Sequence, residues 1–275
     1  MTAIEIFSIL FSGSLLAGLI GALSGLGGGL IIVPLLVFGI HADIHYAIGT
    51  SLIAVIATSS GAASAYVREG FSNVRVGLLL ETGTTFGAIL GVIIGSHLPG
   101  SALHLAFGLV LLYSAIASLY GNGLPAFDLP PDKLATFFKL DGQYPIAKGY
   151  KAYHVQNVPL GYFIILIAGL LSGALGIGSG ALKVLALDKA MKLPFKVSTT
   201  TSNFMIGVTA AASAGLYLHL GYIDPILTLP VLIGVTLGSL CGARILPRMK
   251  TDLLRKLFIL LIVIIAIQMI YTGIF

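Results

Sequence analysis

Two glycine-rich clusters interrupt long apolar stretches of this chain: Gly25-Leu-Gly-Gly-Gly29 and Gly176-Ile-Gly-Ser-Gly180. They lie 151 residues apart (176 − 25). Glycine has no side chain to pack and weakens a helix, so such a cluster predicts a helix that opens at membrane depth. Broken helices of this kind line the solute sites of membrane transporters. The same element is therefore expected twice.

Composition places the chain in a lipid bilayer. Apolar residues make up 57% of it and charged residues 9%, whereas soluble domains carry about 25% charged residues. The mean hydropathy is +1.04. Because a crossing takes about 20 apolar residues, transmembrane helices are predicted over 47–66, 76–95, 105–120, 197–218, 226–243 and 257–274.

One all-α membrane domain over 1–275 is expected, since the longest polar connection is too short for a separate core. The first apolar segment has no Lys or Arg before it, so it lacks the basic start of a secretory signal and is expected to remain in the mature protein. The single cysteine, Cys241, cannot form an internal disulfide and is expected to pack in a helix.

A shift of 151 residues aligns the second half of the chain with the first without a gap. Duplication explains matched glycine clusters followed at equal distance by Thr-Ser better than chance does. The predicted organisation is repeat 1 at 4–121, a cytoplasmic connection at 122–157 and repeat 2 at 158–275. The matches include Gly18 with Gly169, Gly27 with Gly178, Gly29 with Gly180, Thr50-Ser51 with Thr201-Ser202, Gly70 with Gly221, Gly87 with Gly238 and Gly91 with Gly242.

The basic residues predict that the two repeats are inverted. Short cytoplasmic connections accumulate Lys and Arg, and all fifteen basic residues face one side if 4–40 and 158–191 each form a glycine-broken, re-entrant hairpin followed by three crossings. Both termini would then lie outside. In the competing arrangement each broken segment crosses once and the repeats are parallel, which places a basic connection outside.

The glycine clusters suit an anion. A helix that begins at Gly27-Gly28-Gly29 leaves its first N–H groups unpaired and aims its positive dipole end at the gap. Gly178, Ser179 and Gly180 offer the same backbone in the second copy, with a hydroxyl donor added. The alternative is that these glycines only allow close helix contact.

Hydroxyl side chains follow each hairpin. Thr50 and Ser51 match Thr201 and Ser202, and Asn203 adds an amide donor. We expect this set to line the solute site, although capping or helix packing explains any one member equally well.

Two charged residues fall inside apolar segments. Lys183 replaces Ile32 of the first copy and is a candidate counter-charge for an anion, or a lysine that snorkels to the basic face. Glu81 is a candidate to carry a coupled proton, or a structural partner of Arg75 or Arg68. The histidines 45, 104 and 219 are expected at the surface rather than in a proton relay.

The sequence resembles the TauE/SafE sulfite exporter family of membrane transporters. The resemblance rests on Gly18-Leu-Ile-Gly-Ala-Leu-Ser-Gly-Leu-Gly-Gly-Gly-Leu-Ile-Ile-Val-Pro34 and its repeat Gly169-Leu-Leu-Ser-Gly-Ala-Leu-Gly-Ile-Gly-Ser-Gly180, and it covers nearly the whole chain. It implies transport of sulfur-containing anions such as sulfite or sulfonates across a prokaryotic cytoplasmic membrane. The second copy departs from the first at Ser179, Lys183 and Leu185.

The function favoured at this stage is a secondary transporter for a small anion, working by alternating access with or without proton coupling. A passive anion channel is the alternative. A membrane enzyme is disfavoured because nucleophile and metalloprotease motifs are missing, and no metal or other cofactor is predicted. The partners expected are the anion and the lipid bilayer, not nucleic acid; homo-oligomer formation is left open.

Overall fold

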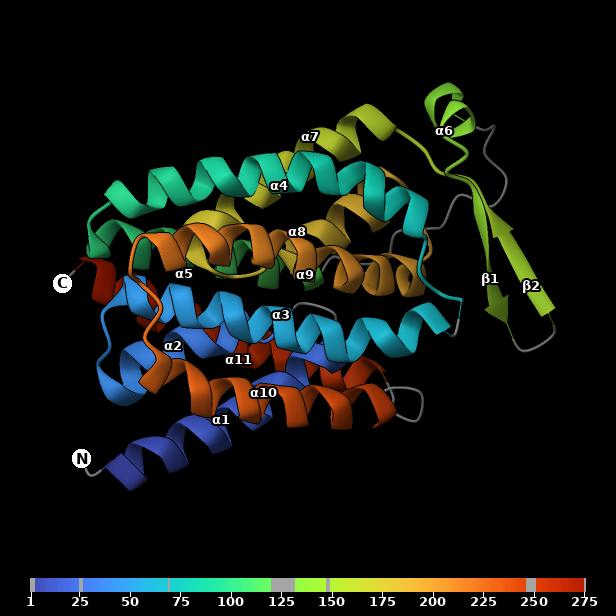
Figure 1. Ribbon diagram of the computed structural model, residues 1–275. Helices are drawn as coiled ribbons and strands as arrows, with labels where there is room; N and C mark the ends of the chain where they lie inside the picture. Colours follow the sequence, from blue (N-terminus) through green and yellow to red (C-terminus); the bar gives the residue numbers. More distant parts are fainter. Residues whose placement is uncertain are drawn as a thin grey trace.

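The protein is a helical bundle with a small β-hairpin at one end (Figure 1). The computed structural model describes residues 3–24, 27–68, 70–119, 132–146, 149–245 and 251–274. The long helices are α1 (Ala3–Ser24), α3 (Ile44–Arg68), α4 (Val74–His97), α5 (Gly100–Leu119), α7 (Val158–Leu175), α9 (Phe195–His219), α10 (Pro225–Ile245) and α11 (Thr251–Ile274).

Five of the described helices are long and apolar enough to cross a membrane: α1, α3, α4, α7 and α10. The described residues of all six predicted crossing segments are helical, in α3, α4, α5, α9, α10 and α11. Helix α9 is not among the five, because Ser, Thr and Asn residues interrupt its apolar sequence. The chain is thus a multi-pass helical membrane protein.

Each glycine cluster joins a long helix to a short one. In the first half α1 leads into α2 (Gly29–Ile40), and in the second α7 leads into α8 (Gly180–Leu185) and a π-helical turn, η1 (Ala186–Ala190). At about 1.5 Å per residue, α2 is about 18 Å long, too short to cross about 30 Å of hydrocarbon. Helix α7 ends at Leu175 and is followed by Gly176, which takes the left-handed conformation and donates its N–H to Ser172 O.

The ends of the bundle differ in what they carry. Both ends of the chain lie at the same end of the bundle, and the β-hairpin lies at the opposite end (Figure 1). The connections from α2 to α3, α4 to α5 and α9 to α10 lie at the end that carries the termini. The connection from α3 to α4 lies at the end that carries the hairpin.

Helices of each half pack against helices of the other half. Helix α1 packs on α10 and α7 packs on α4, while α3 contacts α9 and α5 contacts α11. Small residues allow the close approach: a Cβ at Gly18 would lie 2.4 Å from Val235 O, and one at Gly169 would lie 2.2 Å from Thr84 O. Both glycine and partner shift by 151 residues between these contacts, so the repeat seen in the sequence recurs in the packing.

The connection between the halves is more structured than the sequence suggested. It contains α6 (Lys133–Phe137) and an antiparallel hairpin of β1 (Gly142–Ile146) and β2 (Gly149–Tyr153), in which Gly142 pairs with Tyr153. Asn73 ties it to the bundle by donating to Leu140 O (2.7 Å) and to the Tyr153 hydroxyl (2.9 Å). Burial raises the pKa of Tyr153 to about 12.

Candidate functional site

The two glycine clusters meet in the middle of the bundle. Gly27 and Gly178 have positive φ angles of 77° and 75°, and both face the same two side chains, Val55 of α3 and Ile206 of α9. Each of these is the twelfth residue of a 25-residue helix. A Cβ at Gly29 would lie 2.7 Å from Gly176 O, so only glycine allows the two backbones to approach this closely. Gly25 lies outside the described residues.

Ser51 and Ser202 hold the clusters from equivalent positions. The Ser51 hydroxyl lies 2.8 Å from Gly176 O and 3.4 Å from Gly29 O, so it bridges the two clusters. The Ser202 hydroxyl donates to Gly180 O at 3.3 Å. Both side chains are fully buried. In this conformation both hydroxyls therefore donate their hydrogen bonds to backbone carbonyls.

Thr50 and Thr201 turn toward neighbouring elements instead. Thr50 Oγ1 lies 3.3 Å from Thr228 Oγ1 of α10, and Thr201 Oγ1 accepts a hydrogen bond from Asn73 N at 2.9 Å. Asn203 is buried, and its side-chain Oδ1 has no hydrogen-bond partner among the described residues. The predicted set thus divides into serines on the clusters and threonines on helix contacts.

A buried ion pair and the threonine that bridges it lie beside the second cluster; Lys183, Thr209 and Glu81 are called the charged triad below. Lys183 of α8 is fully buried, and its Nζ donates to Thr209 Oγ1 of α9 at 2.6 Å. Thr209 in turn donates to Glu81 Oε1 of α4. Lys183 Nζ also lies 3.6 Å from Glu81 Oε2, which accepts a further hydrogen bond from Thr84 at 3.0 Å. Three helices thus converge on one ion pair.

The triad disagrees with the snorkelling alternative for Lys183 and gives Glu81 a basic partner other than the two that the sequence suggested. Lys183 does not snorkel to the basic face in this conformation, because its side chain is fully buried against Thr209 and Glu81. Glu81 pairs with Lys183, whereas Arg75 is exposed and donates to Lys139 O at 3.1 Å. The side chain of Arg68 lies outside the described residues.

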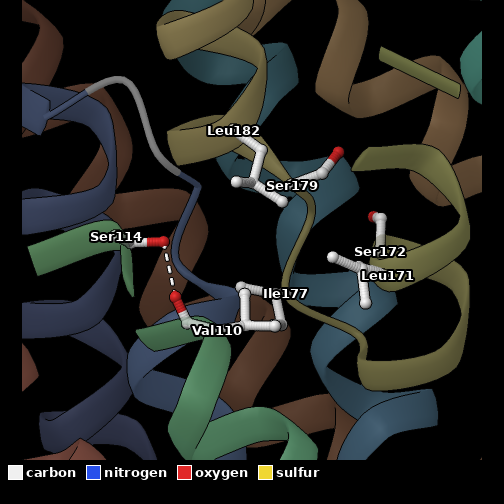
Figure 2. A pocket seen from close by; sticks show the side chains of 7 residues that line it. All are labelled: Val110, Ser114, Leu171, Ser172, Ile177, Ser179 and Leu182. Atoms are coloured by element: carbon white, nitrogen blue, oxygen red, sulfur yellow. Dashed lines mark hydrogen bonds between the residues drawn. The ribbon is translucent and has the colours of Figure 1, made fainter. Parts of the chain in front are cut away.

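A small cavity adjoins the second cluster (Figure 2). It has room for about one water molecule, since the centre of a water-sized sphere can occupy only about 10 Å³. Two of its hydroxyls, Ser172 Oγ and Ser179 Oγ, are buried and have no hydrogen-bond partner among the described residues. The lining residues are Val110, Ser114, Leu171, Ser172, Ile177, Ser179 and Leu182.

Unsatisfied hydroxyls in such a place need an explanation, because buried polar groups are usually hydrogen-bonded. The Ser114 hydroxyl already donates to Val110 O at 2.7 Å (Figure 2). Ser172 and Ser179 therefore remain as hydrogen-bonding groups that a small polar ligand could use. Ser179 takes a left-handed φ of 51°, which fixes where its side chain leaves the turn before α8.

Sequence reasoning missed Thr209 and Ser172. Thr209 is the equivalent of Thr58, but nothing in the sequence connects it to Glu81, which lies 128 residues away. Ser172 belongs to the glycine-rich motif, yet no spacing distinguishes it from the apolar residues around it. A search for buried polar residues on helices next to the clusters would have included both.

The histidines do not gather at this site. His219 is exposed, and His45 pairs with Asp43 at 3.1 Å. His104 differs from the expectation of a surface histidine, because its Nε2 is buried without a partner among the described residues. Across the described ranges, no three His, Cys, Asp or Glu side chains lie close enough together to hold a metal ion.

Residues 10–269 match the family described as Sulfite exporter TauE/SafE. The chain is 28% identical over 276 residues to the probable membrane transporter protein YunE of Bacillus subtilis, covering 98% of this chain and 99% of that protein. It is 29% identical to the probable membrane transporter protein YdhB of the same organism, over 83% of this chain and 86% of the relative. A probable membrane transporter protein of Xylella fastidiosa is 26% identical over 99% of this chain and 98% of its own. No solved structure matches the chain.

Proposed function

The chain belongs to the TauE/SafE sulfite exporter family, and from that premise we propose that it is a secondary transporter for a small sulfur-containing anion, sulfite or a sulfonate. The site lies where the two glycine clusters meet, and the transporter works in a prokaryotic cytoplasmic membrane.

One observation carries this proposal: the second cluster places the Ser179 hydroxyl, which has no hydrogen-bond partner among the described residues, within one turn of a fully buried lysine. Ser179 immediately precedes α8, and Lys183 stands four residues later. Its backbone N–H donates to Ser179 O at 2.9 Å. Hydroxyl donors suit the oxygens of sulfite or a sulfonate, and a buried cation suits their charge. An apolar solute would need neither group.

We further propose that the two halves are inverted repeats that rock against each other around this site. The support is that the hairpins contact the opposite half: α1 packs on α10 and α7 on α4. The connection from α2 to α3 lies at the end that carries the N-terminus, as it must if α1 and α2 form a hairpin and do not cross as one segment (Figure 1). Basic connections would then face the cytoplasm, with both termini outside. Inverted repeats of this kind support alternating access in other transporters.

The test is flux into proteoliposomes that contain the purified protein. Labelled sulfite and the labelled sulfonate isethionate are offered separately, and uptake is measured with and without unlabelled anion inside. A carrier gives saturable uptake that the internal anion accelerates. A linear, non-saturating flux would make the protein a channel, and no flux of either anion would contradict the proposed substrate class.

Gly29→Ala is the variant that connects this flux to the clusters. Its Cβ would lie 2.7 Å from Gly176 O, from Ser51 Oγ and from Val55 Cγ2, so the clusters must separate. Misplacement of about 1 Å in a site can cost about 100-fold in rate, so we expect flux to fall by at least about tenfold. Gly215→Ala is the matched control, because nothing lies within 4 Å of the added Cβ. Equal flux in the two variants would remove the clusters from the transport site.

A further inference from the structure

The ion pair of Glu81 and Lys183 has no counterpart at the equivalent positions of the other half. The positions 151 residues away are Leu232 for Glu81 and Ile32 for Lys183, and the same arrangement of helices forms there with apolar side chains. Replacing a buried ion pair by well-packed apolar residues is often neutral or stabilising. A charged pair retained in a membrane protein is by default functional.

The geometry links the charge on Lys183 to the protonation state of Glu81. Lys183 Nζ is 3.6 Å from Glu81 Oε2, and Thr209 bridges the two by accepting from Lys183 and donating to Glu81. While Glu81 is ionised, its negative charge neutralises Lys183, and a second anion beside Lys183 would be repelled. Protonation of Glu81 removes that charge and leaves the ammonium without an ionic partner.

The surroundings of Glu81 offer few competing charges. Lys183 faces it from α8, and Thr209 faces it from α9. On its own helix, Thr84 and Thr85 donate to it. From α7, the nearest titratable group is Tyr162, whose hydroxyl lies 3.1 Å from Thr82 Oγ1. The next acidic residue after Lys183 is Asp188, which pairs with Lys189 at 3.9 Å.

We propose that Glu81, Thr209 and Lys183 couple the solute to protons: a proton taken up from water by Glu81 breaks the ion pair, and Lys183 then binds the anion. The proton and the anion therefore bind together and cross in the same direction. Thr209 is a positioning residue that holds the pair in register. This inference rests on the proposed function, because it gives Lys183 the role of anion ligand.

Coupling of this kind predicts a pH dependence. The apparent affinity for the anion is its intrinsic affinity multiplied by the fraction of protein with Glu81 protonated. That fraction falls by up to about tenfold per pH unit as the carboxyl ionises. Anion exchange by the wild-type protein should therefore weaken as pH rises, and uptake should carry protons inward.

Glu81→Gln tests this step, since an amide has the shape of a protonated carboxyl but does not ionise. Labelled isethionate and sulfite are each exchanged against internal unlabelled anion over a series of pH values. Proton entry is measured separately, with a trapped dye during net uptake into vesicles without internal anion, because one-for-one exchange returns each proton that enters. In the variant we expect isethionate exchange to persist without the pH dependence, and isethionate uptake to proceed without proton entry. Isethionate decides this point because a sulfonate stays ionised across the series, whereas sulfite itself takes up a proton near neutral pH. Leu232→Gln is the matched control, which places the same amide in the other half and should behave as wild type.

The outcomes separate the two proposals. Wild-type protein that carries neither anion overturns both the function and the coupling. Wild-type protein that carries an anion without proton entry overturns the coupling alone, and this measurement does not depend on whether Glu81→Gln folds. A Glu81→Gln variant that keeps the wild-type pH profile and proton entry also overturns it.

Discussion

The two halves of the molecule share one backbone plan but differ chemically where their glycine clusters meet. Beside the first cluster stand a buried isoleucine, Ile32, and Thr58, which donates only within its own helix to Ala54 O at 2.8 Å. Beside the second, Lys183 and Thr209 occupy the equivalent positions and reach Glu81 of the other half. The packing around the two clusters is thus similar, whereas the buried lysine stands beside the second cluster alone among the described residues.

This difference also decides how the glycines should be interpreted. Gly18 and Gly169 make equivalent contacts with α10 and α4 and serve helix packing in both halves. The residues Gly27, Gly29 and Gly178 instead bring two turns together beside Val55 and Ile206. The sequence left an anion site and close helix contact as alternatives for the cluster glycines. Gly29 does allow close backbone contact, with Gly176, and the anion site stays a prediction.

The largest expected effect comes from making the second half resemble the first. Lys183→Ile alone leaves Glu81 as an uncompensated buried charge, which costs about 3–5 kcal/mol of stability. Lys183→Ile with Glu81→Leu copies Ile32 and Leu232, and stability should return to the wild-type value or rise by about 1–4 kcal/mol. Thermal unfolding in detergent checks both values.

Transport should not return with stability in that double variant. Isethionate and sulfite flux should stay at the level of protein-free liposomes, because no cation remains at the site. A double variant that is stable and still transports would show that the charged triad is dispensable, and the two halves would then be functionally alike.

Thr209→Val and Thr58→Val give the next largest contrast. Hydrogen bonds to charged groups contribute about 1.5–3 kcal/mol, so removing the Thr209 hydroxyl should lower the unfolding free energy by about that amount. Thr58 makes only a bond within its helix, and its loss should change stability by no more than about 0.5 kcal/mol. The two unfolding temperatures are compared in the same detergent. Equal losses would mean that Thr209 contributes no more than an ordinary helical threonine.

Much of this comparison could be predicted from the sequence. The constant spacing of 151 residues predicted which positions correspond, and the apolar stretches predicted the helices. The partner of Glu81 could not be predicted from the sequence. Without the fold, Arg75, Arg68 and Lys183 were all basic residues that could lie next to it. The packing of helices from one half against the other decides the partner. Helix α4 packs on α7 and α9, and this packing brings Glu81 next to Lys183.

Other features could not be predicted from the sequence, because they depend on contacts between distant segments. The cavity beside Ser172 and Ser179 is formed by α5, α7 and the second cluster, which no local pattern connects. The hairpin of β1 and β2 is short, and its strands pair mainly polar and small residues, so it lacks the apolar alternation that predicts a strand. Asn73 and Tyr153 fix it to the bundle through a hydrogen bond across 80 residues.

The smallest contrast is expected where the halves are alike, at Gly18 and Gly169. An added Cβ would lie 2.4 Å from Val235 O in Gly18→Ala and 2.2 Å from Thr84 O in Gly169→Ala. Backbone atoms cannot move aside as a side-chain end can, and overpacking costs about 1–3 kcal/mol. The two variants should therefore lose stability by about the same amount, measured as a shift in unfolding temperature.

Gly215→Ala is the reference for this pair, because its added Cβ meets nothing within 4 Å and alanine favours a helix by up to about 1 kcal/mol. If Gly169→Ala destabilises the protein much more than Gly18→Ala, the asymmetry extends beyond the charged triad into the helix packing. Equal losses would confine the asymmetry to the site, since the two halves would then respond alike to the same packing defect. The charge at Lys183 and Glu81 would then be the difference between the halves that transport depends on.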